Sequence, residues 1–210
     1  MAAEHTITLS PHARNAERGQ HTGMSQGMLA MMLFLGSEAM LFASFFAAYF
    51  MVRYNIAAND WPPLKNVATG ERFELPKLIT GVNTAFLVFS SFTVWFAEHR
   101  LKHGDRKGLE RGLLVTMALG LTFLVVQINE YVHLGFTPQN KAFGATFYTL
   151  TGFHGLHVFV GLVLLLISYI RVKRAHDFTP RWFTPLGAAS LYWHFVDVVW
   201  VFLYVVVYLI

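Results

Sequence analysis

Cysteine is absent from this 210-residue chain, and charged residues are scarce. Without cysteine the chain cannot form disulfides, thiolate zinc sites or iron–sulfur clusters, and it has no cysteine nucleophile. Charged residues make up 13% of the sequence, against about a quarter in a typical soluble domain, while 55% of the residues are hydrophobic. This composition excludes a disordered chain, and it leaves too few polar residues to cover the surface of a soluble fold.

Long apolar runs take up most of the chain. They contain only three charged residues, Glu38, Glu130 and Asp197. A helix that crosses the roughly 30 Å hydrocarbon core of a bilayer needs about 20 apolar residues. We therefore predict an all-α, polytopic membrane protein, a bundle of five transmembrane helices preceded by a polar, mobile cytoplasmic tail over residues 1–24. The predicted membrane domain is 25–210, with spans at about 25–52, 78–97, 113–134, 143–170 and 186–210.

Basic residues gather on one side of this predicted bundle. The tail and the loops 98–112 and 171–185 share one side and hold 11 Lys and Arg residues, whereas the opposite side holds 5. An excess of basic residues marks the cytoplasmic side, so we predict an inside N-terminus and an outside C-terminus. The same placement in short loops accounts for the net charge of +4 without a nucleic-acid partner.

Glu38 lies deep in the first span, roughly 20 Å from its inner end at 1.5 Å per residue. Because a low dielectric disfavours the charged carboxylate, we expect the protonated form there. Two roles stay open: a proton-relay site, or a hydrogen bond that ties two helices together. Ala39, Ala43 and Ala47, spaced by four, predict a small-residue stripe that packs closely against a neighbouring helix.

The fourth span carries His154 and His157, which are three residues apart and therefore share a helix face. They lie roughly 16 and 21 Å below the outer end of the span, a depth that overlaps that of Glu38. Two histidines one turn apart on one helix cannot be opposed axial ligands of one haem. We therefore predict interhelical hydrogen bonds, with Glu38 as a candidate partner, in preference to a metal site.

Two further spans carry polar groups. His194 and Asp197 of the last span are also three apart, so we expect them to pair on one face of that helix. In the third span Gln127, Glu130 and His133 follow one another at intervals of three, and Glu130 lies near enough to the outer surface for water to satisfy it. Together these residues predict an interior polar network without a metal, a nucleotide loop or a soluble catalytic constellation.

Four motifs in these spans resemble the third subunit of haem–copper terminal oxidases, the cytochrome c oxidase subunit 3 family. The resemblance runs in unbroken order from about residue 24 to 210. It rests on Ser37–Phe42, Gln127–Tyr131, Thr151–Val158 and Tyr192–Trp200. Each motif falls in the corresponding helix of the family.

This resemblance implies a non-redox accessory subunit of a proton-pumping oxidase complex that carries electrons from cytochrome c to oxygen. The implied partners are the haem-bearing subunit 1, with subunit 2 in the same complex, and phospholipid; haem and copper would belong to partner subunits and none to this chain. Glu38 matches the family's carbodiimide-reactive glutamate, and Arg171 matches a position associated with lipid headgroups. The implied roles are support of proton uptake and protection of the complex during turnover.

The seven-helix members of the family have two further N-terminal helices, and this five-span sequence resembles the short bacterial form. We therefore expect a bacterial plasma membrane. Quinol oxidases and nitric oxide reductase complexes contain related subunits, and both remain alternatives. Glu38 favours the cytochrome c branch, since the quinol relatives tend to have aspartate there. Alternatives from other classes are a small proton-coupled transporter, which internal repeats would favour and this sequence lacks, and a small haem-binding cytochrome.

Overall fold

The computed structural model describes residues 25–56, 76–134, 138, 141–174 and 183–209. These residues form long helices and two short π-helical segments, with no strand among them. Five helices are long and apolar enough to cross a membrane, which confirms the predicted all-α, five-helix fold. The predicted tail over 1–24 lies outside the described residues. The elements are α2 (Gln26–Met51), η1 (Val52–Ile56), α3 (Lys77–Lys102), α4 (Arg106–His133), α5 (Lys141–Arg174), α6 (Phe183–Tyr204) and η3 (Val205–Leu209).

Four helices, α3 to α6, begin before the apolar runs that predicted them, and α3 and α5 also end beyond them. The largest difference is at α4, which begins at Arg106 and not at the predicted residue 113. Asp105 caps this helix, because its side chain accepts a hydrogen bond from the backbone N–H of Gly108 at 2.9 Å. The cap allows the charged residues of the loop to continue the helix beyond the membrane core.

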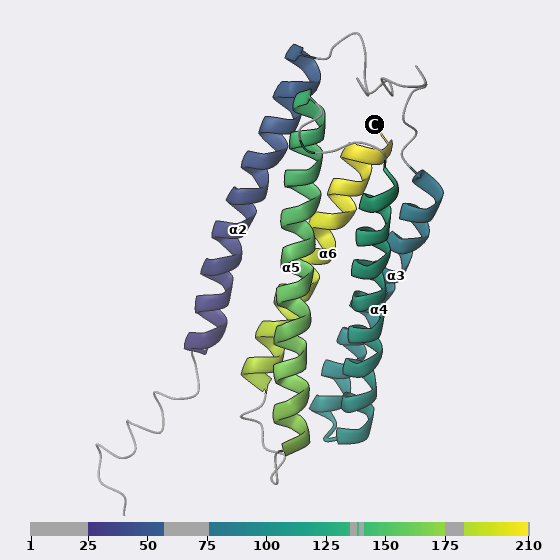
Figure 1. The fold of residues 1–210 in the computed structure, drawn as a ribbon. Coiled ribbons are helices and arrows are strands. Elements are labelled where there is room, and N and C mark those ends of the chain that lie inside the picture. Colours follow the sequence, from purple (N-terminus) through teal and green to yellow (C-terminus); the bar gives the residue numbers. More distant parts are fainter. Residues whose placement is uncertain (1–24, 57–75, 135–137, 139–140, 175–182, 210) are drawn as a thin grey trace, which may run out of the picture.

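The helices run alternately up and down, so that the ends of neighbouring elements meet at the same side of the bundle (Figure 1). Helix α6 lies inside: 56% of the residues in its most apolar stretch are buried, compared with 17% in α2. Helix α2 lies at the edge, where it packs against α5 and α6, while α3 and α4 form a tight hairpin.

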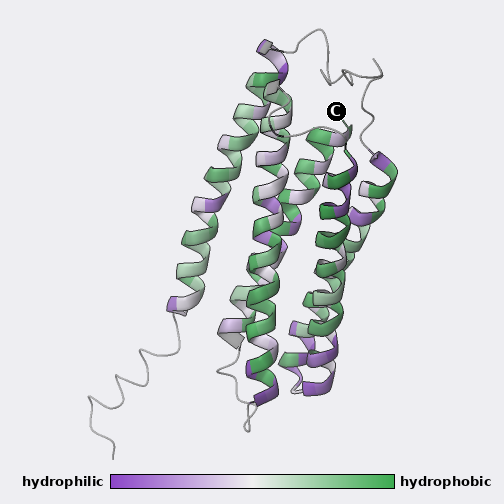
Figure 2. Cartoon of the chain, in the orientation of Figure 1, coloured by the Kyte–Doolittle hydropathy of each residue, from purple (hydrophilic) through white to green (hydrophobic). Residues whose placement is uncertain are grey.

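Hydrophobic residues cover the middle of every helix, and hydrophilic residues concentrate at the helix ends (Figure 2). Many large apolar side chains point outward, among them Leu33 at 69% exposure and Val132 at 75%. A surface of this kind suits hydrocarbon and not water. The few hydrophilic residues at mid-height therefore stand out as candidates for function.

Candidate functional site

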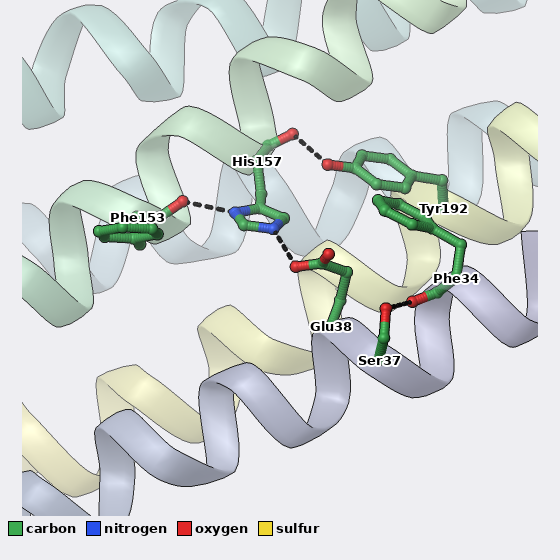
Figure 3. Close-up of polar contacts among 6 residues, drawn as sticks. All are labelled: Phe34, Ser37, Glu38, Phe153, His157 and Tyr192. Atoms are coloured by element: carbon green, nitrogen blue, oxygen red, sulfur yellow. Dashed lines mark hydrogen bonds and ion pairs between the residues drawn. The ribbon is translucent and has the colours of Figure 1, made fainter.

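Glu38 and His157 form a direct contact between α2 and α5 (Figure 3). The Glu38 Oε2 and His157 Nε2 atoms are 2.9 Å apart, and the two side chains are 16% and 11% exposed. This contact confirms the predicted hydrogen bond between Glu38 and the fourth helix. The role of the pair in proton handling stays a prediction.

The second nitrogen of His157 fixes the chemistry of this contact. His157 Nδ1 lies 2.6 Å from the carbonyl oxygen of Phe153, and a carbonyl oxygen only accepts hydrogen bonds. The Nδ1 atom therefore carries a proton, and one further proton lies between His157 Nε2 and Glu38 Oε2. The pair is either a protonated carboxyl beside a neutral imidazole or a carboxylate beside an imidazolium. Its net charge is zero in both forms.

Aromatic rings hold the imidazole in place. The edge of Phe42 meets the His157 ring with centroids 4.9 Å apart, and the Tyr192 ring stacks at 6.5 Å. The Tyr192 hydroxyl donates to the carbonyl oxygen of His157 at 3.2 Å, as Figure 3 shows. These contacts join α2, α5 and α6 around one imidazole, which leaves it little freedom to turn away from Glu38.

The small-residue stripe of α2 faces outward and does not pack against another described helix of this chain, contrary to the prediction. Ala39, Ala43 and Ala47 are all exposed and contact no neighbouring helix of this chain closely enough to be buried. The buried face of α2 consists instead of Leu35 and the aromatic residues Phe42, Phe46 and Tyr49. The contact of α2 with α5 and α6 is therefore made by large side chains, and the small residues of α2 point away from the bundle.

His194 and Asp197 do not form the predicted direct pair. The Ser91 hydroxyl of α3 lies between them: it donates to Asp197 Oδ2, and His194 Nδ1 lies 3.1 Å from Ser91 Oγ. Since the single Ser91 proton is given to Asp197, His194 Nδ1 acts as the donor to Ser91. The two α6 residues therefore bind α3 and not one another, because both side chains face that helix.

Glu130 is buried and not satisfied by water, contrary to the prediction. Its Oε2 atom accepts from Thr80 Oγ1 at 3.1 Å, and its Oε1 atom accepts from the Tyr208 hydroxyl at 2.9 Å. The reason is tertiary: α3 and the C-terminal segment η3 pack over the end of α4 and exclude solvent there. Glu130 thus connects three elements.

His154 lies apart from Glu38, so the predicted hydrogen bond holds for only one of the two histidines. Its ring is 1% exposed and packs between Phe123, with centroids 5.9 Å apart, and Trp200, at 4.7 Å. Among the described residues neither ring nitrogen has a hydrogen-bond partner. The offset of about 60° from His157 around α5 directs His154 toward α4 and α6 and away from α2.

The remaining predicted residue, Arg171, is exposed in the last turn of α5 beside two other basic residues. Sequence reasoning missed the three hydroxyl donors Ser91, Thr80 and Tyr208. Serine and threonine in helices commonly bond to their own backbone, so their presence in an apolar span predicts no partner. Within the described ranges, no group of three or more His, Asp or Glu side chains is arranged to hold a metal ion.

Comparison with known proteins identifies the family. Residues 11–210 match the family described as cytochrome c oxidase subunit III. The chain is 40% identical to cytochrome c oxidase subunit 3 of Anopheles gambiae over 91% of its own length and 72% of that protein. It is 38% identical to the subunit of Equus caballus, and 39% to that of Loxodonta africana, each over 91% of this chain and 73% of the relative. This chain therefore belongs to the cytochrome c oxidase subunit III family, accessory subunits of haem–copper oxidases that hold no redox centre.

Proposed function

We propose that this chain packs against the haem-bearing subunit 1 of an oxidase that takes electrons from cytochrome c, with subunit 2 in the same complex. In that complex it would bind phospholipid, sustain proton uptake and prolong the active life of the enzyme. The observation that carries the proposal is the 2.9 Å contact between Glu38 Oε2 and His157 Nε2, with His157 Nδ1 held by the Phe153 carbonyl oxygen. A proton that moves within this pair leaves its net charge unchanged, so each charge formed in the low dielectric has an opposite charge beside it.

The exposed face of α2 supports the contact with a larger subunit. This face carries Gly36, Ala43 and Ala47 beside Met40, which is 73% exposed. Small residues let helix backbones approach closely, and such approach drives helix association in membranes. Glu38 is two residues from both Gly36 and Met40 and therefore lies on the other side of α2, where it faces α5. A partner helix on the exposed face would thus hold α2 in place without contacting the Glu38–His157 pair.

An apolar groove supports the binding of phospholipid. It has a volume of about 260 Å³ and lies between α3 and α4, lined by Leu78, Ile79, Val82, Asn83, Phe86 and Val126. Its size and lining suit an acyl chain. Arg171, at the opposite end of the bundle, is exposed for a phosphate headgroup in the other leaflet. Localisation in a bacterial plasma membrane is the part of the proposal that rests on the five-span resemblance, and membrane fractionation tests it.

Substitutions at Glu38 separate the proton role from the structural one. Glu38→Gln keeps a donor for His157 Nε2 but cannot release a proton, whereas Glu38→Ala removes the contact. We expect both variants to keep the haem content of the complex, measured by absorption. Glu38→Gln should assemble normally and lose activity after fewer turnovers, and Glu38→Ala should also lower the yield of assembled complex.

The matched control is Ser44→Ala, on the exposed part of α2, where the hydroxyl bonds only to the backbone of its own helix. It should leave assembly, haem content and active life unchanged. An unaltered active life in Glu38→Gln would show that Glu38 only ties α2 to α5. Loss of haem from a normally assembled Glu38→Ala complex would contradict the non-redox role.

A further inference from the structure

His99 and His103 lie one helical turn apart at the end of α3, outside the site described above. Their ring centroids are 4.4 Å apart, and both residues are exposed. Helix α3 has 26 residues and is about 39 Å long, so its last turn projects beyond a hydrocarbon core of about 30 Å. The two imidazoles are therefore accessible to ions in solution.

We propose that His99 and His103 form a binding site for a divalent transition-metal ion such as Zn²⁺ or Cu²⁺. Imidazole nitrogens bind these ions at about 2.0–2.1 Å, which places two nitrogens on one ion roughly 3–3.5 Å apart. Two rings with centroids at 4.4 Å reach that separation by small side-chain rotations. The exposed position leaves the other coordination positions to water.

The hydrogen bonds of His103 prepare it as a ligand. Its Nδ1 atom lies 2.8 Å from the carbonyl oxygen of His99, so Nδ1 carries the proton and the Nε2 lone pair is free. Metal-binding histidines usually donate their other N–H to a carbonyl or a carboxylate in this way. Trp95 stacks on the His99 ring, with centroids 5.9 Å apart and planes at 19°, which restrains the second ligand.

The side chains around the two histidines indicate which kind of ion the site binds. Asp105 is engaged by Gly108 and Arg100, and Glu98 faces α6, where its Oε1 atom lies 4.0 Å from the Cβ position of Gly187. Neither carboxylate is hydrogen-bonded to His99 or His103, and the Arg100 and Lys102 side chains belong to the same turn. Calcium and magnesium prefer oxygen ligands, so a pair of imidazoles does not suit them. Imidazole ligands favour Cu²⁺, followed by Zn²⁺.

His133 provides a matched control inside the same chain. It is exposed at the end of α4, and its Nδ1 lies 2.8 Å from the carbonyl oxygen of Asn129, as in His103. No second histidine stands one turn before it, because residue 129 is Asn. A single imidazole binds these ions far more weakly than a pair that chelates them.

The test uses the full chain in detergent with Zn²⁺ and Cu²⁺ added separately. The histidines outside the described residues are replaced by Gln in every sample, so that they bind no ion: His5, His12, His21 and His176. Equilibrium dialysis should then give one strongly bound ion per chain. Bound Cu²⁺ should quench Trp95, a fluorescence loss that Trp95→Phe removes.

We expect His99→Gln and His103→Gln each to weaken binding by more than about tenfold, whereas His133→Gln leaves it unchanged. Helical content measured by circular dichroism should be the same in all three, since the three side chains are exposed. Binding by His103→Gln as tight as in the parent chain would overturn the proposal. An equal loss in His133→Gln would also overturn it, since the site would then not require a pair.

Discussion

Hydroxyl groups donate to two of the carboxyl groups inside the described part of the bundle. Glu130 receives hydrogen bonds from Thr80 and Tyr208, and Asp197 receives one from Ser91. A hydroxyl can face either a protonated or an ionised carboxyl, and it brings no second charge into the membrane. These residues therefore connect helices in either protonation state.

The Tyr208 hydroxyl tests this interpretation at the residue scale. Tyr208→Phe removes the donor to Glu130 Oε1 and leaves a buried oxygen without that partner. We expect the free energy of unfolding in detergent to fall by about 1–3 kcal/mol. Tyr54→Phe is the control, since Tyr54 is 64% exposed, and its effect should stay within about 0.5 kcal/mol. Equal effects of the two substitutions would show that the hydroxyl contact contributes nothing.

Sequence reasoning predicted the Glu38–His157 contact because the two residues lie at similar depths, in the first and fourth spans. It failed for His194 and Asp197, whose partner Ser91 depends on how α3 is rotated about its axis. An apolar run that is hydrophobic all round carries no signal for that rotation. Burial of Glu130 escaped prediction for a related reason, since it depends on where the distant C-terminal segment packs.

At the scale of the elements, small residues determine how closely the helices approach. Trp193 of α6 is fully buried between two glycines, Gly120 of α4 and Gly161 of α5. A Cβ atom would lie 2.5 Å from Trp193 Cη2 at Gly120 and 2.8 Å from Trp193 Cε3 at Gly161. The indole N–H donates to Ser90 of α3 at 2.9 Å, so one side chain joins four helices.

Gly120→Ala and Gly161→Ala should therefore destabilise the bundle by about 1–3 kcal/mol each, because the added methyl group displaces a buried indole. Gly152→Ala on α5 is the matched control: a Cβ atom there has no neighbour within 4 Å. Alanine also favours a helix over glycine, so this control should be neutral or more stable by up to about 1 kcal/mol. Thermal unfolding in detergent measures the difference. The same sign at Gly152 and Gly120 would contradict the close packing around Trp193.

At the scale of the whole molecule, the distribution of basic residues predicts the orientation in the membrane. The turn between α3 and α4 and the last turn of α5 lie at the same end of the bundle and are rich in Lys and Arg. The segment η1 and the start of α3 lie at the opposite end. The predicted cytoplasmic side is the first of these, with 11 basic residues against 5 in the full sequence.

The absence of cysteine makes this orientation directly measurable, since an introduced cysteine is the only thiol of the chain. Asn55→Cys and Lys107→Cys lie at opposite ends of the bundle, and both positions are exposed. In sealed right-side-out vesicles a membrane-impermeant maleimide should label Asn55→Cys, whereas Lys107→Cys should react only after the membrane is permeabilised. Inside-out vesicles should give the reverse pattern and so control for thiol reactivity. Labelling of Lys107→Cys from outside would show that the basic residues of the α3–α4 turn do not stay in the cytoplasm, and the orientation would have to be inverted.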